Sequence, residues 1–179
     1  MRKRNLTSCL VESIIEYAKF QVDEAILRRD NKMQEQYYTA YEKRYQAAYS
    51  AGAERWGTSP EDDVLYNSLK NWVEENDLKG KKVIEYACGE GACGVILSKL
   101  GCIYHGVDLS PSAIEKSNKI LEEYPDAKCE VLDMVAECVK ESYDAALDCM
   151  GLHMLVTDND RKSYLRNAYN SLNAGAPML

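Results

Sequence analysis

The sequence predicts an α/β fold built on a doubly wound parallel sheet, and three observations favour it. Residues 82–101 have the pattern of a strand, a turn with two glycines and a helix. After them, apolar strand-like runs alternate with helix-like runs. Acidic residues stand at the ends of successive predicted strands. Ligands of such folds bind beyond the carboxyl ends of the strands, so we expect a binding site at that edge.

Composition favours a single domain without a nucleic-acid or membrane partner. The chain has 179 residues, 46% of them apolar, which is enough for one core. Its formal net charge of −7 disfavours nonspecific attraction to nucleic acid or anionic membrane. No apolar run is long enough to span a bilayer, and charged residues interrupt any signal-peptide core. We therefore expect a cytoplasmic protein.

The first part of the chain is predicted to be helical. Residues 6–27 and 31–49 carry apolar residues at helical spacing, and a capping serine with proline at residues 59–60 predicts the start of a third helix. The second helix has a stripe of tyrosines, which fits either packing on the core or contact with a ligand: Tyr37, Tyr38, Tyr41, Tyr45 and Tyr49. We divide the chain into a helical segment of residues 1–58 and a main domain of residues 59–179.

The glycine turn is predicted to hold a small molecule. Residues 83–87 form the predicted strand, Gly89 and Gly91 allow a tight turn, and the N–H groups of the next helix, residues 92–100, face the ligand. Residues 89–94 also match the G-x-G-x-x-G pattern of dinucleotide binding.

Nearby carboxylates argue against a dinucleotide. Glu85, Glu90 and Asp108 surround the turn, and Asp133 and Asp148 follow later strands. Such an acidic rim would repel a pyrophosphate and attract a ligand with a sulfonium and an ammonium group. The electrostatics favour S-adenosylmethionine over NAD.

Three further strands are predicted after the turn. The second, residues 102–107, ends in Asp108, about 20 residues after the glycines, where a carboxylate can accept hydrogen bonds from ribose hydroxyls. Asp108 could instead cap the following helix, but Ser110 suits that role better. Residues 128–132 and 143–147 are the third and fourth strands, and residues 160–172 a further helix. We expect the first strand to lie between the second and the fourth.

These motifs together resemble the class I S-adenosylmethionine-dependent methyltransferases. Residues 83–91 and 106–114 are similar to the first two motifs of that family, residues 143–155 to its fourth-strand motif, and residues 172–176 to the entry to a fifth strand. The resemblance covers residues 82–179. It implies a Rossmann-like fold of the methyltransferase type that transfers a methyl group to a small-molecule acceptor by in-line displacement. Ala87 departs from the family pattern, which usually has glycine there, so we expect a slightly tighter pocket.

The resemblance also implies roles for particular residues. It implies that the cofactor is contacted at the turn, after the second strand, after the third strand and beside its methionine end. The residues that would make these contacts are Glu85, Ala87, Gly89, Gly91, Asp108, Leu109, Asp133, Met134 and Cys149. Asp133 could equally be a solvated loop residue. The family's aromatic lid, which precedes the catalytic domain, is similar to residues 41–60 and implies that Tyr41, Tyr45 and Trp56 lie over the cofactor or acceptor, where aromatic faces attract a sulfonium.

His153 is the candidate general base, because it follows the fourth strand on the acceptor side and histidine exchanges protons readily near neutral pH. A packed or capping role for His153 is the alternative. The seven cysteines include no C-x-x-C pair and are expected to be mostly buried apolar groups without a metal, although a thiolate cluster for a soft ion is an alternative.

The chain stops where the fifth strand of this fold begins. We therefore expect residues 145–147 of the fourth strand to have an exposed edge, completed by a longer chain or by another copy in a homo-oligomer. Two other functions stay open. An NAD-dependent oxidoreductase is supported by the glycine pattern, and a catalytically silent cofactor-binding module by the short C-terminus.

Overall fold

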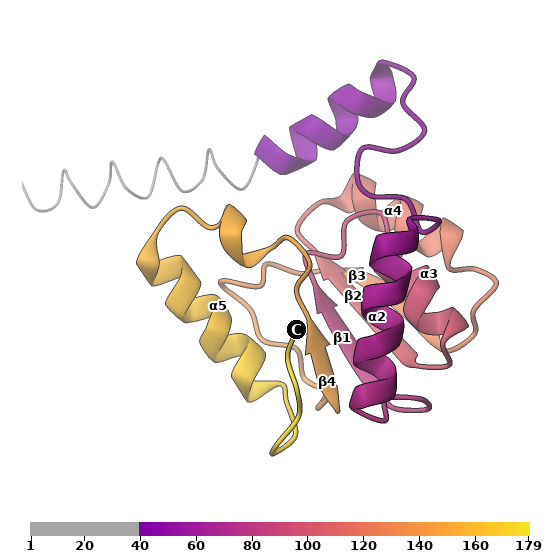
Figure 1. Cartoon of the computed structure of the whole chain (residues 1–179). Coiled ribbons are helices and arrows are strands. Elements are labelled where there is room, and N and C mark those ends of the chain that lie inside the picture. Colours follow the sequence, from indigo (N-terminus) through magenta and orange to yellow (C-terminus); the bar gives the residue numbers. More distant parts are fainter. Residues whose placement is uncertain (1–39) are drawn as a thin grey trace, which may run out of the picture. The chain divides into compact units, whose positions relative to one another are not determined.

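The computed structural model of this chain describes residues 40–179, of which Tyr41–Leu179 form one compact unit (Figure 1). The helix predicted for residues 6–27 lies outside the described residues, as does the helix predicted for residues 31–49 up to residue 39. Residues 40–50 are helical, in agreement with the second prediction. Within the described part of the chain, no helix is long and apolar enough to cross a membrane.

Within residues 40–179 the sheet has four parallel strands in the order β3-β2-β1-β4. Their bounds are β1 (Lys82–Tyr86), β2 (Ile103–Asp108), β3 (Ala127–Val131) and β4 (Ala145–Leu147). The prediction that the first strand lies between the second and the fourth is confirmed. Strand order reverses beside β1, and a ligand site is expected at the carboxyl end of that strand.

Several of the helices begin at side-chain caps. In α2 (Asp63–Glu75), Asp62 accepts a hydrogen bond from the N–H of Leu65. The prediction of a start at Ser59 is therefore wrong by three to four residues, because the carboxylate of Asp62 caps the helix instead. Ser110 caps α4 (Pro111–Ile120), with proline at its first position, as the sequence predicts.

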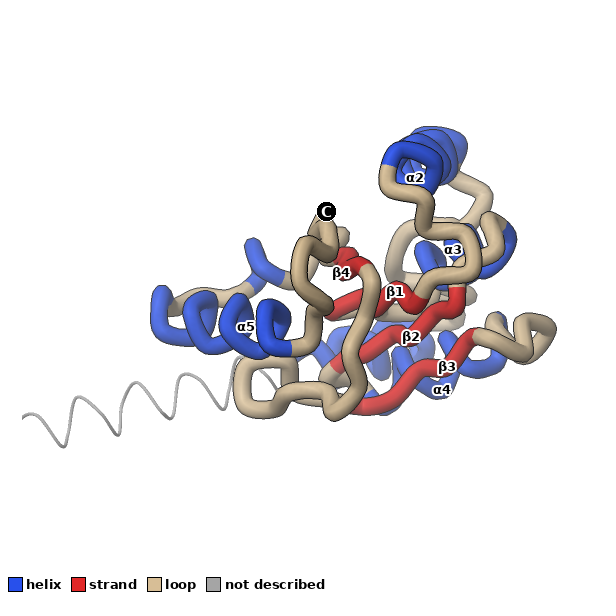
Figure 2. Tube along the Cα trace, turned by 90° about the horizontal axis from the view of Figure 1, so that it is seen from below, coloured by secondary structure: helices blue, strands red, loops and turns tan. Residues whose placement is uncertain are grey.

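Helices cover both faces of the sheet (Figure 2). On one face, α2, α3 (Ala92–Lys99) and α4 share a buried apolar cluster with Val83, Tyr104, Cys129 and Ala145 of the strands. On the other face lies α5 (Asp158–Asn170), where Tyr164 packs edge-on against Tyr86 of β1 at a ring-centroid distance of 5.2 Å. This is the doubly wound α/β architecture that the sequence predicts.

The outer edge of β4 is paired. The N–H of Ala146 donates to the carbonyl of Pro177 (3.0 Å), Leu179 donates to Ala146 (3.1 Å), and Asp148 donates to Leu179 (2.9 Å). The expectation of an exposed edge at residues 145–147 is therefore wrong, because the last residues of the chain run parallel to β4. That edge gives no reason to expect another copy.

Candidate active site

The turn after β1 depends on left-handed backbone conformations. Ala87, Gly89 and Gly91 have φ angles of 53°, 52° and 78°. Glycine adopts such angles without cost, whereas an alanine there is disfavoured by about 1–2 kcal/mol. Gly91 is the N-cap residue of α3 and has no side chain, so the first N–H groups of the helix are not satisfied by a side-chain cap. The turn thus presents backbone donors beside a bend that a Cβ would strain.

Asp108 connects the end of β2 to this turn. Its carboxylate is 8% exposed and accepts hydrogen bonds from the N–H groups of Gly89 and Ser110, each at 2.8 Å. Burial raises its pKa, and these two hydrogen bonds oppose the shift. Asp108 and the glycine turn therefore lie side by side, as a ligand that spans both requires.

The aromatic residues of segment 41–57 lie over the turn. The hydroxyl of Tyr45 is 2.8 Å from the position that a Cβ on Gly89 would occupy. The Tyr45 ring is 8% exposed and meets Trp56 edge-on at a centroid distance of 4.7 Å, while Tyr41 lies 6.4 Å from the same indole. Burial raises the pKa of Tyr45, and the charges of Asp108 and Glu90 raise it further. We call residues 41–57 the lid.

Polar contacts hold the lid on the domain. Glu90, between the two glycines of the turn, accepts hydrogen bonds from the hydroxyl of Tyr49 (2.8 Å) and from the N–H groups of Trp56 (3.0 Å) and Gly57 (2.7 Å). At the other end of the lid, Glu42 binds the start of α4. Sequence reasoning noted Glu90 as part of the acidic rim and missed its partners, which are 33 to 41 residues away.

Glu42 and Lys116 are functional candidates that the sequence analysis did not single out. Glu42 accepts hydrogen bonds from the hydroxyls of Ser110 (2.5 Å) and Ser112 (2.6 Å) at the start of α4. Partial burial raises the pKa of Glu42, but these hydrogen bonds lower it by more, so its pKa is below the ordinary value. The ammonium of Lys116 lies 3.6 Å from the ring centroid of Tyr49 and donates to the carbonyl of Glu54. Nothing in their local sequence distinguishes them from ordinary surface charges.

Glu85 does not reach the rim. Its side chain is 2% exposed and accepts a hydrogen bond from the hydroxyl of Tyr104 on the face of the sheet that α3 covers. Burial raises its pKa to about 8, with hydrogen bonds from Tyr104 and Cys93 opposing the shift. At neutral pH Glu85 is therefore largely protonated, which weakens the acidic rim that the sequence predicts.

The loops after β2 and β3 carry three further residues that the sequence analysis assigns to the cofactor. Leu109 is half-buried next to Asp108. Asp133 is also half-buried and accepts hydrogen bonds from the N–H groups of Val135 (2.9 Å) and Ala136 (3.2 Å). The carbonyl of Met134 accepts a hydrogen bond from Asn167 of α5. Asp133 thus stabilises its own loop, and a carboxylate has further acceptor positions for a ligand.

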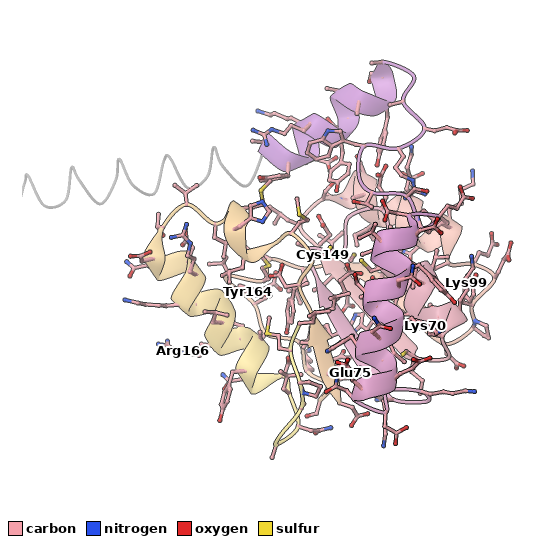
Figure 3. The ribbon with its side chains drawn as sticks, viewed as in Figure 1. Lys70, Glu75, Lys99, Cys149, Tyr164 and Arg166 are labelled. Carbon is pink, nitrogen blue, oxygen red and sulfur yellow. The ribbon has the colours of Figure 1, made fainter. Side chains whose placement is uncertain are left out.

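The end of β4 borders the turn on the other side. Asp148 accepts hydrogen bonds from the N–H groups of Gly151 (2.5 Å) and Leu152 (2.9 Å) and from the hydroxyl of Tyr164 (2.6 Å), which α5 supplies (Figure 3). These contacts fix the short helix η1 (Leu152–Met154), on which His153 is exposed. Cys149 is exposed as well, and a hydrogen bond from the Cys93 thiol lowers its pKa to about 7 although burial opposes this.

No group of three or more histidine, cysteine, aspartate or glutamate side chains suited to a metal occurs within residues 40–179. In this part of the chain Cys88, Cys93, Cys102 and Cys129 are buried, whereas Cys138 and Cys149 are exposed. The described part of the chain therefore gives the thiolate cluster no support.

Comparison with known proteins gives consistent results. Residues 84–178 match the methyltransferase domain family. The ribosomal protein L11 methyltransferase of Psychrobacter arcticus is 40% identical over 50 residues, which is 27% of this chain and 16% of that protein. The enzyme of the same name from Escherichia coli strain 55989 is 38% identical over 52 residues, 28% of this chain and 18% of that protein. The chain thus matches less than a fifth of the length of these relatives.

Solved structures share the fold at low sequence identity. A TehB-like S-adenosylmethionine-dependent methyltransferase from Corynebacterium glutamicum has a TM-score of 0.53 and 22% identity, covering 76% of this chain and 67% of that one. The amino pentose methyltransferase CalS10 from Micromonospora echinaspora, with S-adenosylmethionine bound, has a TM-score of 0.57 and 18% identity, covering 74% and 52%.

Proposed function

We propose that this chain, which belongs to the methyltransferase domain family, binds S-adenosylmethionine as its cofactor and transfers the methyl group to a small-molecule acceptor beneath its aromatic lid. The observation that carries the proposal is the contact of Asp108 with Gly89 at the carboxyl ends of β2 and β1, with Tyr45 directly above. It supports one extended ligand that lies across the turn and under the lid.

The residues present fit the cofactor. The N–H groups at the start of α3 suit the carboxylate of its amino-acid tail, with Ala87, Gly89 and Gly91 shaping the bend. Asp108 accepts two hydrogen bonds from the backbone, and a carboxylate has about four acceptor positions, so ribose hydroxyls can use the others. Leu109, Asp133 and Met134 are assigned to the adenine.

Two residues proposed from the sequence take revised positions. Glu85 lies beneath the turn, bonded to Tyr104, so its proposed part is to support the turn from below. Cys149 is exposed after β4 and is assigned to the methionine end.

In the proposed reaction this chain positions the acceptor and shields the reacting groups from water. When bound, the cofactor supplies a methyl group on a sulfonium, which is already an activated electrophile. Tyr41, Tyr45 and Trp56 provide an aromatic wall that excludes water and holds the acceptor in line. His153, exposed on η1, is proposed to take the proton that an amine or hydroxyl acceptor loses.

A small-molecule acceptor is favoured by the lid. Its contacts with Glu90 and with Ser110 and Ser112 keep aromatic rings close to the turn, where they would cover a small acceptor. Structural neighbours include an amino pentose methyltransferase and a glycopeptide N-methyltransferase. The L11 methyltransferases, which are 40% identical to this chain over an aligned stretch of 50 residues, make a protein acceptor the second candidate.

Calorimetry tests the cofactor site. We expect the full chain to bind S-adenosylhomocysteine and not NAD. Asp108→Asn should weaken that binding about tenfold to a hundredfold, because a hydrogen bond to a charged group contributes roughly 1.5–3 kcal/mol. Asp126→Asn, an exposed aspartate just before β3, is the matched control and should bind like the wild type. Binding of NAD in place of S-adenosylhomocysteine would indicate the oxidoreductase instead.

Methyl transfer tests the acceptor class. Cofactor with a radiolabelled methyl group is incubated with the full chain and a panel of small amines, thiols and alcohols, and in parallel with ribosomal protein. We expect label in a small-molecule fraction. Label in protein alone would exclude the small-molecule acceptor. Tight cofactor binding without transfer to any acceptor would favour the catalytically silent module.

A further inference from the structure

Glu90 joins two segments that are far apart in the sequence. It lies between Gly89 and Gly91, and its carboxylate is 5% exposed. Both of its oxygens accept hydrogen bonds from the lid: the hydroxyl of Tyr49 donates to Oε1, and the N–H groups of Trp56 and Gly57 donate to Oε2. The lid backbone passes so close that a Cβ on Gly57 would lie 3.3 Å from Oε2. The turn and the lid are therefore in direct contact through this carboxylate.

The direction of the Glu90 side chain depends on the shape of the turn. Gly89 and Gly91, its two neighbours, have left-handed φ angles of 52° and 78°. A change in either residue would rotate the peptide groups beside Glu90 and move its carboxylate away from Trp56 and Gly57. A ligand that hydrogen-bonds to the turn would favour the present shape and with it the contact to the lid.

We propose that Glu90 is a positioning residue that couples cofactor binding at the turn to closure of the lid. The inference rests on the proposed function, because it needs the cofactor at the turn. It goes beyond that function in assigning the carboxylate a task that does not involve contact with cofactor or acceptor. Since coupling between two events is reciprocal, a closed lid must also strengthen cofactor binding by the same factor.

Two other contacts hold the lid without involving the turn. Glu42 accepts hydrogen bonds from Ser110 and Ser112 at the start of α4, and Lys116 of α4 lies against the ring of Tyr49. Loss of the Glu90 contacts should therefore remove the hydrogen bonds between the turn and the lid and leave the lid attached to α4. This separation makes the coupling measurable in a folded protein.

Amide hydrogen exchange of the full chain, with S-adenosylhomocysteine as the probe, tests the coupling. In the wild type we expect the probe to slow exchange at the N–H groups of Trp56 and Gly57, which donate to Glu90. Glu90→Ala removes the acceptor of both donors, so the probe should no longer slow their exchange. By reciprocity, calorimetry should show binding of the probe weakened about 5- to 50-fold.

The controls separate coupling from a general loss of structure. Glu54→Ala makes the same chemical change on an exposed lid residue and should behave like the wild type. Tyr49→Phe removes one of the bonds to Glu90 and should give an intermediate effect. Exchange of the buried amides of β1 and β2 must stay slow in every variant that is compared.

The possible results distinguish failure of the coupling from failure of the proposed cofactor site. If the wild type does not bind the probe, the proposed cofactor site fails, and the coupling with it. If the wild type binds the probe but exchange at Trp56 and Gly57 does not change, the coupling is overturned while the proposed function stands. The coupling is likewise overturned if Glu90→Ala binds the probe and protects both amides as the wild type does.

Discussion

Glu85 is a carboxyl group held inside an apolar core. Its partner Tyr104 is itself fully buried, and Cys93 is its other neighbour. Desolvation favours the neutral acid and raises the pKa of Glu85 from 4.5 to about 8. The unfolded chain releases this proton at lower pH than the folded chain, so folding stability must fall as the pH rises from about 4.5 through 8.

Glu85→Gln should remove this dependence, because an amide does not titrate. Near pH 4 we expect wild type and variant to have similar free energies of unfolding. At pH 7 the variant should be more stable, by up to about 3 kcal/mol, since each pKa unit corresponds to about 1.4 kcal/mol. Urea unfolding of both proteins between pH 4 and pH 8 measures the difference. A difference that stays constant with pH would show that Glu85 is ionised in the core.

The side chain of Ala87 leaves no room for a side chain at Gly151. A Cβ on Gly151 would lie 2.8 Å from the Cβ of Ala87 and 3.0 Å from a carboxylate oxygen of Asp148. Gly151→Ala should therefore cost about 1–3 kcal/mol of stability through overpacking. In an Ala87→Gly background the cost should be smaller, because one of the two close neighbours is gone. A double-mutant cycle in denaturant measures this coupling, and additive effects would disprove it.

His153 is exposed on η1, so its replacement should not disturb the fold. If it acts as general base, His153→Gln should lower kcat by about 10²–10⁴-fold with an acceptor that loses a proton. Affinity for S-adenosylhomocysteine, measured by calorimetry, should stay unchanged. Unaltered turnover would remove His153 from catalysis and leave positioning as the main source of rate.

At the scale of single elements, the caps determine where helices begin. Thr157 precedes α5 and accepts a hydrogen bond from the N–H of Asp160 through its side chain (3.1 Å). This helix covers the second face of the sheet and supplies Tyr164 to Asp148. Its first turn thus stabilises both the core and the loop after β4.

Thr157→Ala should destabilise the protein by about 1 kcal/mol, because an N–H of the first turn loses its acceptor. Thr58→Ala, at an exposed threonine just after the lid, is the matched control and should change the free energy of unfolding by less than about 0.5 kcal/mol. Urea unfolding compares the two variants. Equal effects would mean that the cap contributes no more than an ordinary surface threonine.

At the scale of the whole molecule, residues 177–179 pair with the outer edge of β4. They satisfy the N–H groups of Ala146 and Asp148 and donate one hydrogen bond in return. Asp148 in turn holds η1, so the last residues of the chain support one wall of the candidate site.

Deletion of residues 177–179 should therefore lower stability by roughly 1–3 kcal/mol, because buried backbone groups of β4 lose their partners. The exposed edge should also promote association between chains. Urea unfolding and light scattering at several protein concentrations test both effects. Leu179→Ala keeps the backbone contacts and is the control, and a deletion no worse than this substitution would contradict the prediction.

The sequence by itself determined the place of the first strand between the second and the fourth, the glycine turn, the Ser110 cap and the place of Asp108 beside Gly89. The turn and the cap follow from signals within a few residues, namely glycine at positive φ and a side chain that reaches its own helix N-terminus, and the other two features follow from the regular arrangement of a doubly wound sheet.

Only the tertiary structure decided that Glu90 holds the lid, that Glu85 is buried under Tyr104, and that the edge of β4 is paired. The reason is physical. A carboxylate on a loop or strand has the same local pattern whether it faces water, a ligand or a tyrosine from another strand. Its partner is set by how distant segments pack, and it was therefore not predictable from the residues beside it.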